Sequence, residues 1–184
     1  IAADIHASGP ITFERFMELA LYHPTFGYYM RATKPEERIG WDGDYYTSFD
    51  VHPILAQALA RQIRQVDERL GSPDPFTVVE MGPGKGLLAR DFLAACAQGA
   101  PTHLARLHYI LIERSPAMIA EQRRALAPWL PYGNVSWLNS LGDLADDGES
   151  AVEVQHAFAV DQISEVDAFH QAHREVDEAI ALAR

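Results

Sequence analysis

Cysteine and long hydrophobic runs are the two features that this sequence of 184 residues most clearly lacks. Cys96 is the only cysteine, so no disulfide can form within the chain, and a reducing compartment is compatible with it. No apolar stretch approaches the ~20 residues that a membrane-spanning helix needs. The first ten residues have neither the basic nor the apolar segment of a secretory signal. We therefore expect a soluble, cytoplasmic protein without membrane contacts.

Basic residues are also scarce, with 15 Lys and Arg against 26 Asp and Glu, which gives a net charge of −11. Binding to nucleic acid or to an anionic membrane needs a basic face that neutralises phosphates. The charge balance therefore argues against a general nucleic-acid binder. Hydrophobic residues make up 48% of the chain, as expected for a globular protein with a core of its own.

The first 75 residues predict helices and loops rather than a sheet. Apolar residues recur at helical spacing in 11–23, where Thr12 can cap the helix, and again in 54–70, where Gly71 ends it. Between these helices we expect a short extended segment at 25–34, a polar loop at 35–44 and an aromatic strand or loop at 45–50. We place a domain boundary at 71–75, so that residues 1–75 form an N-terminal cap region.

Residues 76–150 change character, because short β-branched apolar runs now alternate with helical patterns. Strands are predicted at 76–82, 107–113 and 134–140, and helices at 87–98 and 115–130, the second with Ser115 as cap and Pro116 in its first turn. This alternation indicates an α/β fold with a parallel sheet. In 151–184 we expect a possible strand at 151–155 and then an acidic helix, which is either a solvated surface or a docking surface.

The segment "VVEMGPGKG", residues 78–86, places three glycines directly after the first predicted strand. Glycines allow positive φ and let a ligand approach the backbone, and the following helix directs its first N–H groups to the same place. Open α/β sheets bind ligands at the edge formed by the carboxyl ends of their strands, where this loop would lie. The loop lacks the Ser or Thr of a Walker A sequence, and its spacing differs from G-x-G-x-x-G. The sequence therefore predicts a cofactor loop formed by Gly82, Pro83, Gly84 and Gly86.

Acidic residues near this loop indicate which cofactor it holds. Glu80 precedes the glycines, where a carboxylate suits an ammonium group, such as that of S-adenosylmethionine, better than a pyrophosphate. Glu113 ends the second strand, where a carboxylate can accept hydrogen bonds from ribose hydroxyls. Asn139 or Ser140 would end the third strand beside an adenine. We therefore predict S-adenosyl-L-methionine as cofactor, with an NAD(P)-dependent oxidoreductase as the alternative that the glycine spacing disfavours.

Three blocks in order, "GPITFERFMELALYHPTFGYY", "GDYYTSFDVHP" and "VVEMGPGKGLLARDFL", resemble the MidA family of S-adenosylmethionine-dependent methyltransferases over residues 9–141. The resemblance implies a Rossmann-like class I methyltransferase sheet with a helical N-terminal addition. Relatives of this family include a mitochondrial complex I assembly factor that methylates protein arginine. The resemblance thus implies a protein substrate, a respiratory complex I subunit as candidate partner, and the mitochondrial matrix in a eukaryote.

The same resemblance assigns further residues. It gives the glycines and Glu80 to the cofactor loop and Glu113 to the ribose. The block "GDYYTSFDV", with Phe49 where the family usually has proline, would line the junction of cofactor and acceptor through Thr47 and Ser48. Asp44 and Asp50 are the candidates to orient the acceptor nitrogen, and His52 could relay its proton. We predict no metal site.

The chain departs from the family downstream of the third predicted strand, where we find no stretch resembling N-E-x-x-D-A-x-P. We therefore expect a sheet that is incomplete in its C-terminal half, from a fragment, a truncated homologue or a discontinuity near Ser150. A cofactor-binding assembly factor without catalysis is the alternative function, with 151–184 as a separate segment.

Overall fold

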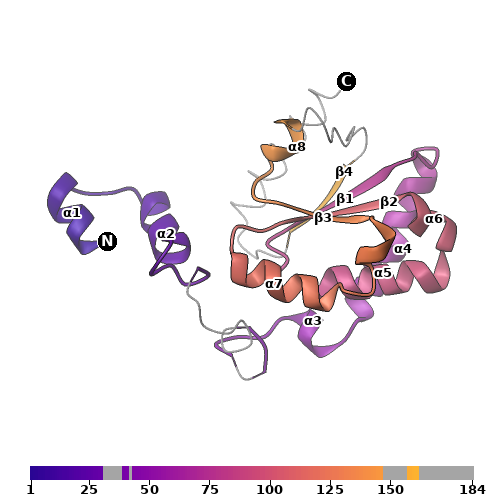
Figure 1. Cartoon of the computed structure of the whole chain (residues 1–184), viewed down its shortest axis with the longest axis horizontal. Helices are drawn as coiled ribbons and strands as arrows, with labels where there is room; N and C mark the ends of the chain where they lie inside the picture. The colour runs from indigo at the N-terminus through magenta and orange to yellow at the C-terminus, as the bar shows by residue number, and fades with distance from the viewer. Residues whose placement is uncertain (31–38, 42, 147–156, 162–184) are drawn as a thin grey trace.

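Four parallel strands form one sheet in the computed structural model, which describes residues 1–30, 39–41, 43–146 and 157–161. The strands are β1 (Phe76–Met81), β2 (Leu107–Ile112), β3 (Val135–Leu138) and β4 (Ala157–Asp161). Their order is β3-β2-β1-β4, so Val79 of β1 pairs with Ile110 on one side and with Ala159 on the other. The chain runs outward from β1 to β3 and then crosses back to the other side of β1 (Figure 1). The α/β fold predicted from the sequence is confirmed.

One face of this sheet is covered by long helices, α4 (Ile54–Arg69), α5 (Leu87–Gly99) and α7 (Pro116–Ala125) (Figure 1). α5 packs on this face with Leu88, Phe92 and Leu93, all buried. On the opposite face Val79, Ile110 and Ile112 contact residues that lead into the short helix α8 (Asp143–Asp146). Side chains on both faces of β1 and β2 are therefore buried, which explains why these strands are apolar runs rather than alternating patterns.

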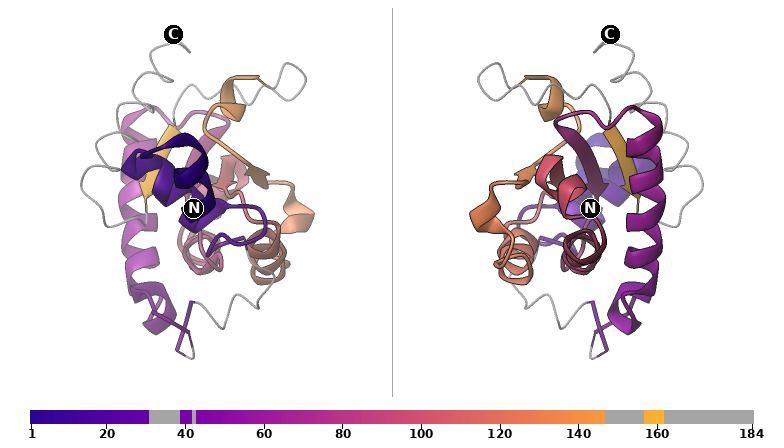
Figure 2. Two further views of the ribbon diagram at one scale, coloured as in Figure 1. Left: turned by 90° about the vertical axis from the view of Figure 1, so that its left-hand side faces the viewer. Right: turned by 90° about the vertical axis from the view of Figure 1, so that its right-hand side faces the viewer.

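The N-terminal helices α1 (Ala2–Ser8) and α2 (Phe13–Tyr22) lie beyond the carboxyl ends of the strands (Figures 1 and 2). The hydroxyl of Thr12 accepts a hydrogen bond from the N–H of Arg15 at 3.1 Å, so the predicted cap of α2 is confirmed. Ser115 caps α7 in the same way, through the N–H of Met118. The helical N-terminal addition therefore faces the edge at which a parallel sheet binds ligands.

Several predicted segments differ from the structure. Residues 24–30 form turns rather than an extended segment, and 48–51 form the short helix α3 (Ser48–Val51). The loop expected before β2 contains another helix, α6 (Pro101–Arg106), and a 3-10 turn (η2, Leu130–Tyr132) follows α7. Residues 157–161 were predicted as helix but form β4. The possible strand at 151–155 and the rest of the acidic helix lie outside the described residues.

Candidate functional site

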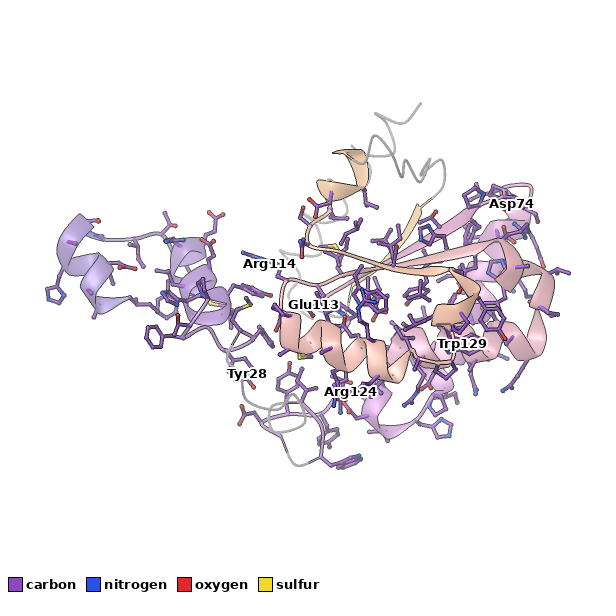
Figure 3. The ribbon with its side chains drawn as sticks, in the orientation of Figure 1. Tyr28, Asp74, Glu113, Arg114, Arg124 and Trp129 are labelled. Atoms are coloured by element: carbon purple, nitrogen blue, oxygen red, sulfur yellow. The ribbon has the colours of Figure 1, made fainter. Side chains whose placement is uncertain are left out.

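A cavity of about 540 Å³ opens at the carboxyl ends of β1 and β2, within the usual size range of small-molecule sites. Figure 3 shows that Asp74, just before β1, lies at one end of the sheet and Glu113, just after β2, at the other. The cavity wall includes seven of the residues predicted for the site: Thr47, Asp50, Gly82, Pro83, Gly84, Glu113 and Asn139.

The glycine loop forms the floor of this cavity. Gly82, Gly84 and Gly86 all have positive φ, at 61°, 53° and 77°. A Cβ built at Gly84 would meet no atom within 4 Å, because this position is open. The loop is held to β2 by a hydrogen bond from the N–H of Gly82 to the carbonyl of Ile112 at 3.2 Å. Bare backbone therefore faces the cavity at Gly84, where a ligand can approach it closely.

Glu113 lies on the same edge of the sheet, next to the loop. One carboxylate oxygen accepts a hydrogen bond from the N–H of Ser115 at 2.7 Å, and the other accepts one from the side chain of Gln122 at 3.2 Å. Burial raises the pKa of Glu113, and these hydrogen bonds oppose the shift. The predicted juxtaposition of glycine loop and strand-end acid is therefore present, with a half-buried carboxylate whose two oxygens have fixed positions.

Glu80 does not lie where a residue that contacts the ammonium group of the cofactor is expected. Its side chain is fully buried beneath the loop and does not form part of the cavity wall. The hydroxyl of Tyr109 donates to it at 2.8 Å. Burial, and then the charge of Glu80, raise the pKa of Tyr109 well above its usual range. Direct contact of Glu80 with the cofactor stays a prediction, and the structure does not bring it to the cavity.

The segment around α3 closes another side of the cavity. Asp50 accepts hydrogen bonds from the N–H and the hydroxyl of Thr47 at 2.8 and 2.9 Å, and it forms an ion pair with Lys85 of the glycine loop. The side chains of Lys85 and Asp50 are 17% and 3% exposed. Burial alone would raise the pKa of Asp50, but the hydrogen bonds from Lys85 and Thr47 lower it overall. Asp50 is therefore fully engaged within the protein, and its neighbour Ser48 is exposed outside the cavity wall.

The other two predicted catalytic residues lie outside the cavity wall. Asp44 accepts a hydrogen bond from the hydroxyl of Tyr28 at 2.7 Å. The ring of His52 is exposed, and its Nδ1 accepts a hydrogen bond from the N–H of Ile54 at the start of α4. In the structure Asp44 and His52 each form a hydrogen bond within the protein and do not reach the cavity. Their catalytic roles stay predictions.

At the end of β3 the two predicted adenine contacts differ in position. Asn139 borders the cavity, whereas Ser140 does not. The hydroxyl of Ser140 donates to Asp143 at 2.9 Å, and the N–H groups of both residues donate to the same carboxylate. These hydrogen bonds lower the pKa of Asp143. Ser140 therefore fixes the turn into α8, and Asn139 is the residue with access to a ligand.

Tyrosines from the N-terminal region complete the wall. Tyr22, Tyr29 and Tyr45 all border the cavity, and the rings of Tyr22 and Tyr29 lie 5.8 Å apart. The hydroxyls of Tyr29 and Tyr45 are 3.3 Å apart, and burial raises the pKa of Tyr45. The guanidinium of Arg114, labelled beside Glu113 in Figure 3, lies over the Tyr22 ring at 4.8 Å. This part of the site thus has aromatic faces that are accessible to planar or cationic groups.

Sequence reasoning did not find Gln122, nor the ion pair between Lys85 and Asp50. Gln122 of α7 is fully buried and connects Glu113 to the glycine loop. Its spacing was a usable signal, because Met118, Gln122 and Leu126 lie four residues apart on the buried side of one helix. A polar residue within a buried apolar stripe needs hydrogen-bond partners, and therefore marks a structural or functional network. The partner of Lys85 was also missed, because 35 residues separate Lys85 and Asp50.

The fold and the site together define a class of protein. A parallel sheet of this strand order, with a glycine loop after its first strand and an acidic residue after its second, is the architecture of nucleoside-cofactor-binding α/β proteins. The chain belongs to the family described as "Putative S-adenosyl-L-methionine-dependent methyltransferase", which matches residues 58–179. This match confirms the family predicted from the sequence.

Curated relatives carry the name protein arginine methyltransferase NDUFAF7. The Drosophila melanogaster homologue is 37% identical over 93 residues, which are 50% of this chain and 20% of that protein. The Mus musculus protein is 28% identical over 161 residues, or 77% of this chain and 36% of that protein. Both are named as mitochondrial. The chain therefore spans between a fifth and a little over a third of the length of these relatives.

A solved structure agrees with the fold. A Burkholderia thailandensis protein bound to S-adenosyl-homocysteine aligns with a TM-score of 0.62 and 32% identity, over 76% of this chain and 35% of that protein. Within the described part of the chain no helix is long and apolar enough to cross a membrane. The comparisons give no support to the predicted cytoplasmic location, since the named relatives are mitochondrial proteins.

Proposed function

We propose that this chain forms the cofactor-binding part of an S-adenosylmethionine-dependent methyltransferase that acts on a protein side chain. The observation that carries the proposal is one cavity bordered both by Gly82–Gly84 and by Glu113, from adjacent parallel strands. Family membership and the neighbour that contains S-adenosyl-homocysteine support it. When bound, the cofactor supplies an activated methyl group.

The residues present suit this cofactor. The open position beside Gly84 leaves space for the amino-acid end of the ligand against the loop backbone, and Glu113 offers carboxylate oxygens to two ribose hydroxyls. Asn139, which borders the same cavity after β3, is the residue that we propose for contact with the adenine. Lys85 is paired with Asp50, so it holds the segment around α3 on the loop. By aligning the two reactants and excluding water, such a site supplies much of the acceleration of a group transfer.

For the acceptor we propose an arginine side chain, on the basis of the names of the curated relatives. The tyrosine wall supports a cationic or planar acceptor, because Tyr29 and Tyr45 bring aromatic rings to the cavity. A respiratory complex I subunit as substrate, and a mitochondrial location, remain predictions from the resemblance and from those names.

Calorimetric titration with S-adenosylmethionine, S-adenosylhomocysteine and NADH tests the cofactor. We expect the two sulfur nucleosides to bind and NADH not to bind; binding of NADH alone would favour the oxidoreductase. Incubation with methyl-labelled cofactor and a cell lysate, followed by acid hydrolysis, tests the acceptor. Labelled methylarginine is the expected product. Cofactor binding without any labelled product would favour the assembly factor without catalysis.

A further inference from the structure

Gln122 has no predicted role, yet its side chain is bonded to three parts of the candidate site. Its Nε2 donates to the carbonyl of Gly84 at 2.8 Å and to a carboxylate oxygen of Glu113 at 3.2 Å. Its Oε1 accepts a hydrogen bond from the indole Nε1 of Trp137 on β3 at 2.9 Å. The side chain is fully buried, so no water competes for these bonds. One amide group thus joins the glycine loop, the acid after β2 and the third strand.

The orientation of this amide is determined by its partners. An indole N–H can only donate, so it requires the oxygen of Gln122 rather than the nitrogen. The NH₂ group then faces the other two partners, a carbonyl and a carboxylate, which as acceptors need its two N–H groups. In the reverse orientation the NH₂ group would face the indole N–H, which is also a donor. The amide oxygen would then face two acceptors, so none of the three hydrogen bonds could form. Trp137 therefore fixes which atoms of Gln122 face the cofactor site.

The backbone is shaped to let Gln122 approach the loop. A Cβ on Gly86 would lie 3.3 Å from both the Cα and the Cγ of Gln122, which is closer than ordinary contact. Gly86, which does not border the cavity, thus makes room for α7 against the start of α5. The third glycine of the loop serves helix packing, and this packing brings the amide of Gln122 within reach of Gly84.

We propose that Gln122 is a positioning residue that sets the distance and orientation of Glu113 relative to the glycine loop. The proposal rests on the proposed cofactor site. The N–H of Ser115 holds one oxygen of Glu113 and Gln122 holds the other, so the direction in which the carboxylate faces the ribose is fixed at both oxygens. Without Gln122 the carboxylate can rotate away, and the ribose loses the bonds that distinguish it from a deoxygenated sugar.

The test compares adenosine with 2′,3′-dideoxyadenosine, which lacks both ribose hydroxyls, in competition with S-adenosylhomocysteine. Hydrogen bonds to a charged acceptor predict that the wild type prefers adenosine by roughly tenfold or more. Gln122→Met has similar length and only a weakly accepting sulfur, and Gln122→Leu has no hydrogen-bonding atom, so neither variant can donate to Glu113 or Gly84. We expect the preference to fall towards one in both variants. Leu126→Ala is the matched control. Leu126 is buried one turn after Gln122, directly after the end of α7, and the variant should melt earlier and keep the preference.

A preference that survives in both Gln122 variants would overturn this inference. Survival in either variant alone would overturn it as well, since packing at this position would then suffice. Trp137→Phe keeps an aromatic ring but removes the indole N–H together with part of the ring system. It should reduce the preference partly, which provides a test even if the Gln122 variants do not fold. A wild-type protein that binds neither nucleoside nor S-adenosylhomocysteine would instead refute the proposed cofactor site, and this inference with it.

Discussion

Gly84 is the position where a side chain would most directly obstruct the candidate site. Its φ of 53° strains any β-branched residue, and a Cβ there points into open space at the cavity. We predict that Gly84→Val abolishes binding of S-adenosylhomocysteine in calorimetry. Gly133→Val is a matched control, because Gly133 has a φ of 70° and equally open surroundings but lies before β3, away from the cavity. Normal affinity in Gly84→Val, or equal losses in both variants, would contradict the assignment of the loop.

Glu113 allows a second prediction at the residue scale. Replacing it with alanine removes the acceptor proposed for the ribose, and we expect the binding free energy of S-adenosylhomocysteine to weaken by roughly 1–3 kcal/mol. Glu121→Ala is the control, since Glu121 lies on α7, pairs with Arg124 and does not border the cavity. If the dissociation constant were the same in Glu113→Ala and in the wild type, the ribose would have to bind elsewhere.

Residues of the site differ in how far the sequence could reveal them. Gly82, Gly84 and Glu113 follow strands in a recognisable order, so their place at one sheet edge was predictable. Glu80 follows the same pattern, but strand alternation directs its side chain into the core beside Tyr109, away from the cavity. Gln122 and the partner of Lys85 depend on contacts between distant segments, which no local pattern contains.

At the scale of elements, the pair of Lys85 and Asp50 holds the segment around α3 against the glycine loop. Removing one partner of a buried pair leaves an uncompensated charge, at a cost of about 3–5 kcal/mol in the free energy of unfolding. We predict that Lys85→Met and Asp50→Asn each destabilise in urea titrations, and that the double variant loses clearly less than the sum of the two. The exposed pair of Arg64 and Glu68 provides a control cycle with a coupling of about 0.3–0.5 kcal/mol. Additive losses for Lys85 and Asp50 would contradict this role.

The opposite end of the sheet has a buried network of its own, between α4 and α6. Asp67 accepts hydrogen bonds from His103 Nδ1 at 3.0 Å and from Arg106 at 2.7 Å. Burial lowers the pKa of His103 below its usual 6.5, despite the hydrogen bond to Asp67. Burial alone would raise the pKa of Asp67, but its hydrogen bonds from Arg106 and His103 lower it overall. The hydrogen bond to Asp67 raises the pKa of Arg106. Both side chains therefore stay charged near neutral pH.

These shifts predict a pH dependence of stability. Because the folded pKa of His103 lies below the unfolded value, the unfolded chain binds more protons just below pH 6.5, and stability falls as the pH drops through that window. Thermal melting between pH 7.5 and 5.5 should show a smaller decrease in His103→Gln than in the wild type. Part of the decrease will remain, since burial also lowers the pKa of His108. Parallel curves for the two proteins would exclude this contribution of His103.

The elements themselves were largely predictable, with exceptions that have a physical cause. The helices at α2, α4, α5 and α7 and the first three strands follow clear periodicity and capping signals. The sequence predicts a helix where β4 forms, because a short buried apolar run does not distinguish a strand from a helix, and the residues after it repeat at helical spacing. α6 was not predicted, because its six residues are too few to show a period.

At the scale of the whole molecule, the return of the chain to the far side of β1 creates the place for a ligand. β2 and β3 lie on one side of β1 and β4 on the other, so the strand order reverses beside the glycine loop. The N-terminal region then covers this edge from outside, where Ser115 donates to the carbonyl of Tyr29 at 2.7 Å. Sequence alone indicated the sheet and the loop, but the position of this region over the edge depends on such long-range contacts.

The most direct test of the account is a crystal structure of the protein with S-adenosylhomocysteine. We predict that the ligand lies in the cavity at the carboxyl ends of β1 and β2, with its ribose hydroxyls on the carboxylate of Glu113 and its amino-acid end against Gly82–Gly84. A ligand found at another edge of the sheet, or with its ribose away from Glu113, would contradict the central claim that these two features form one cofactor site.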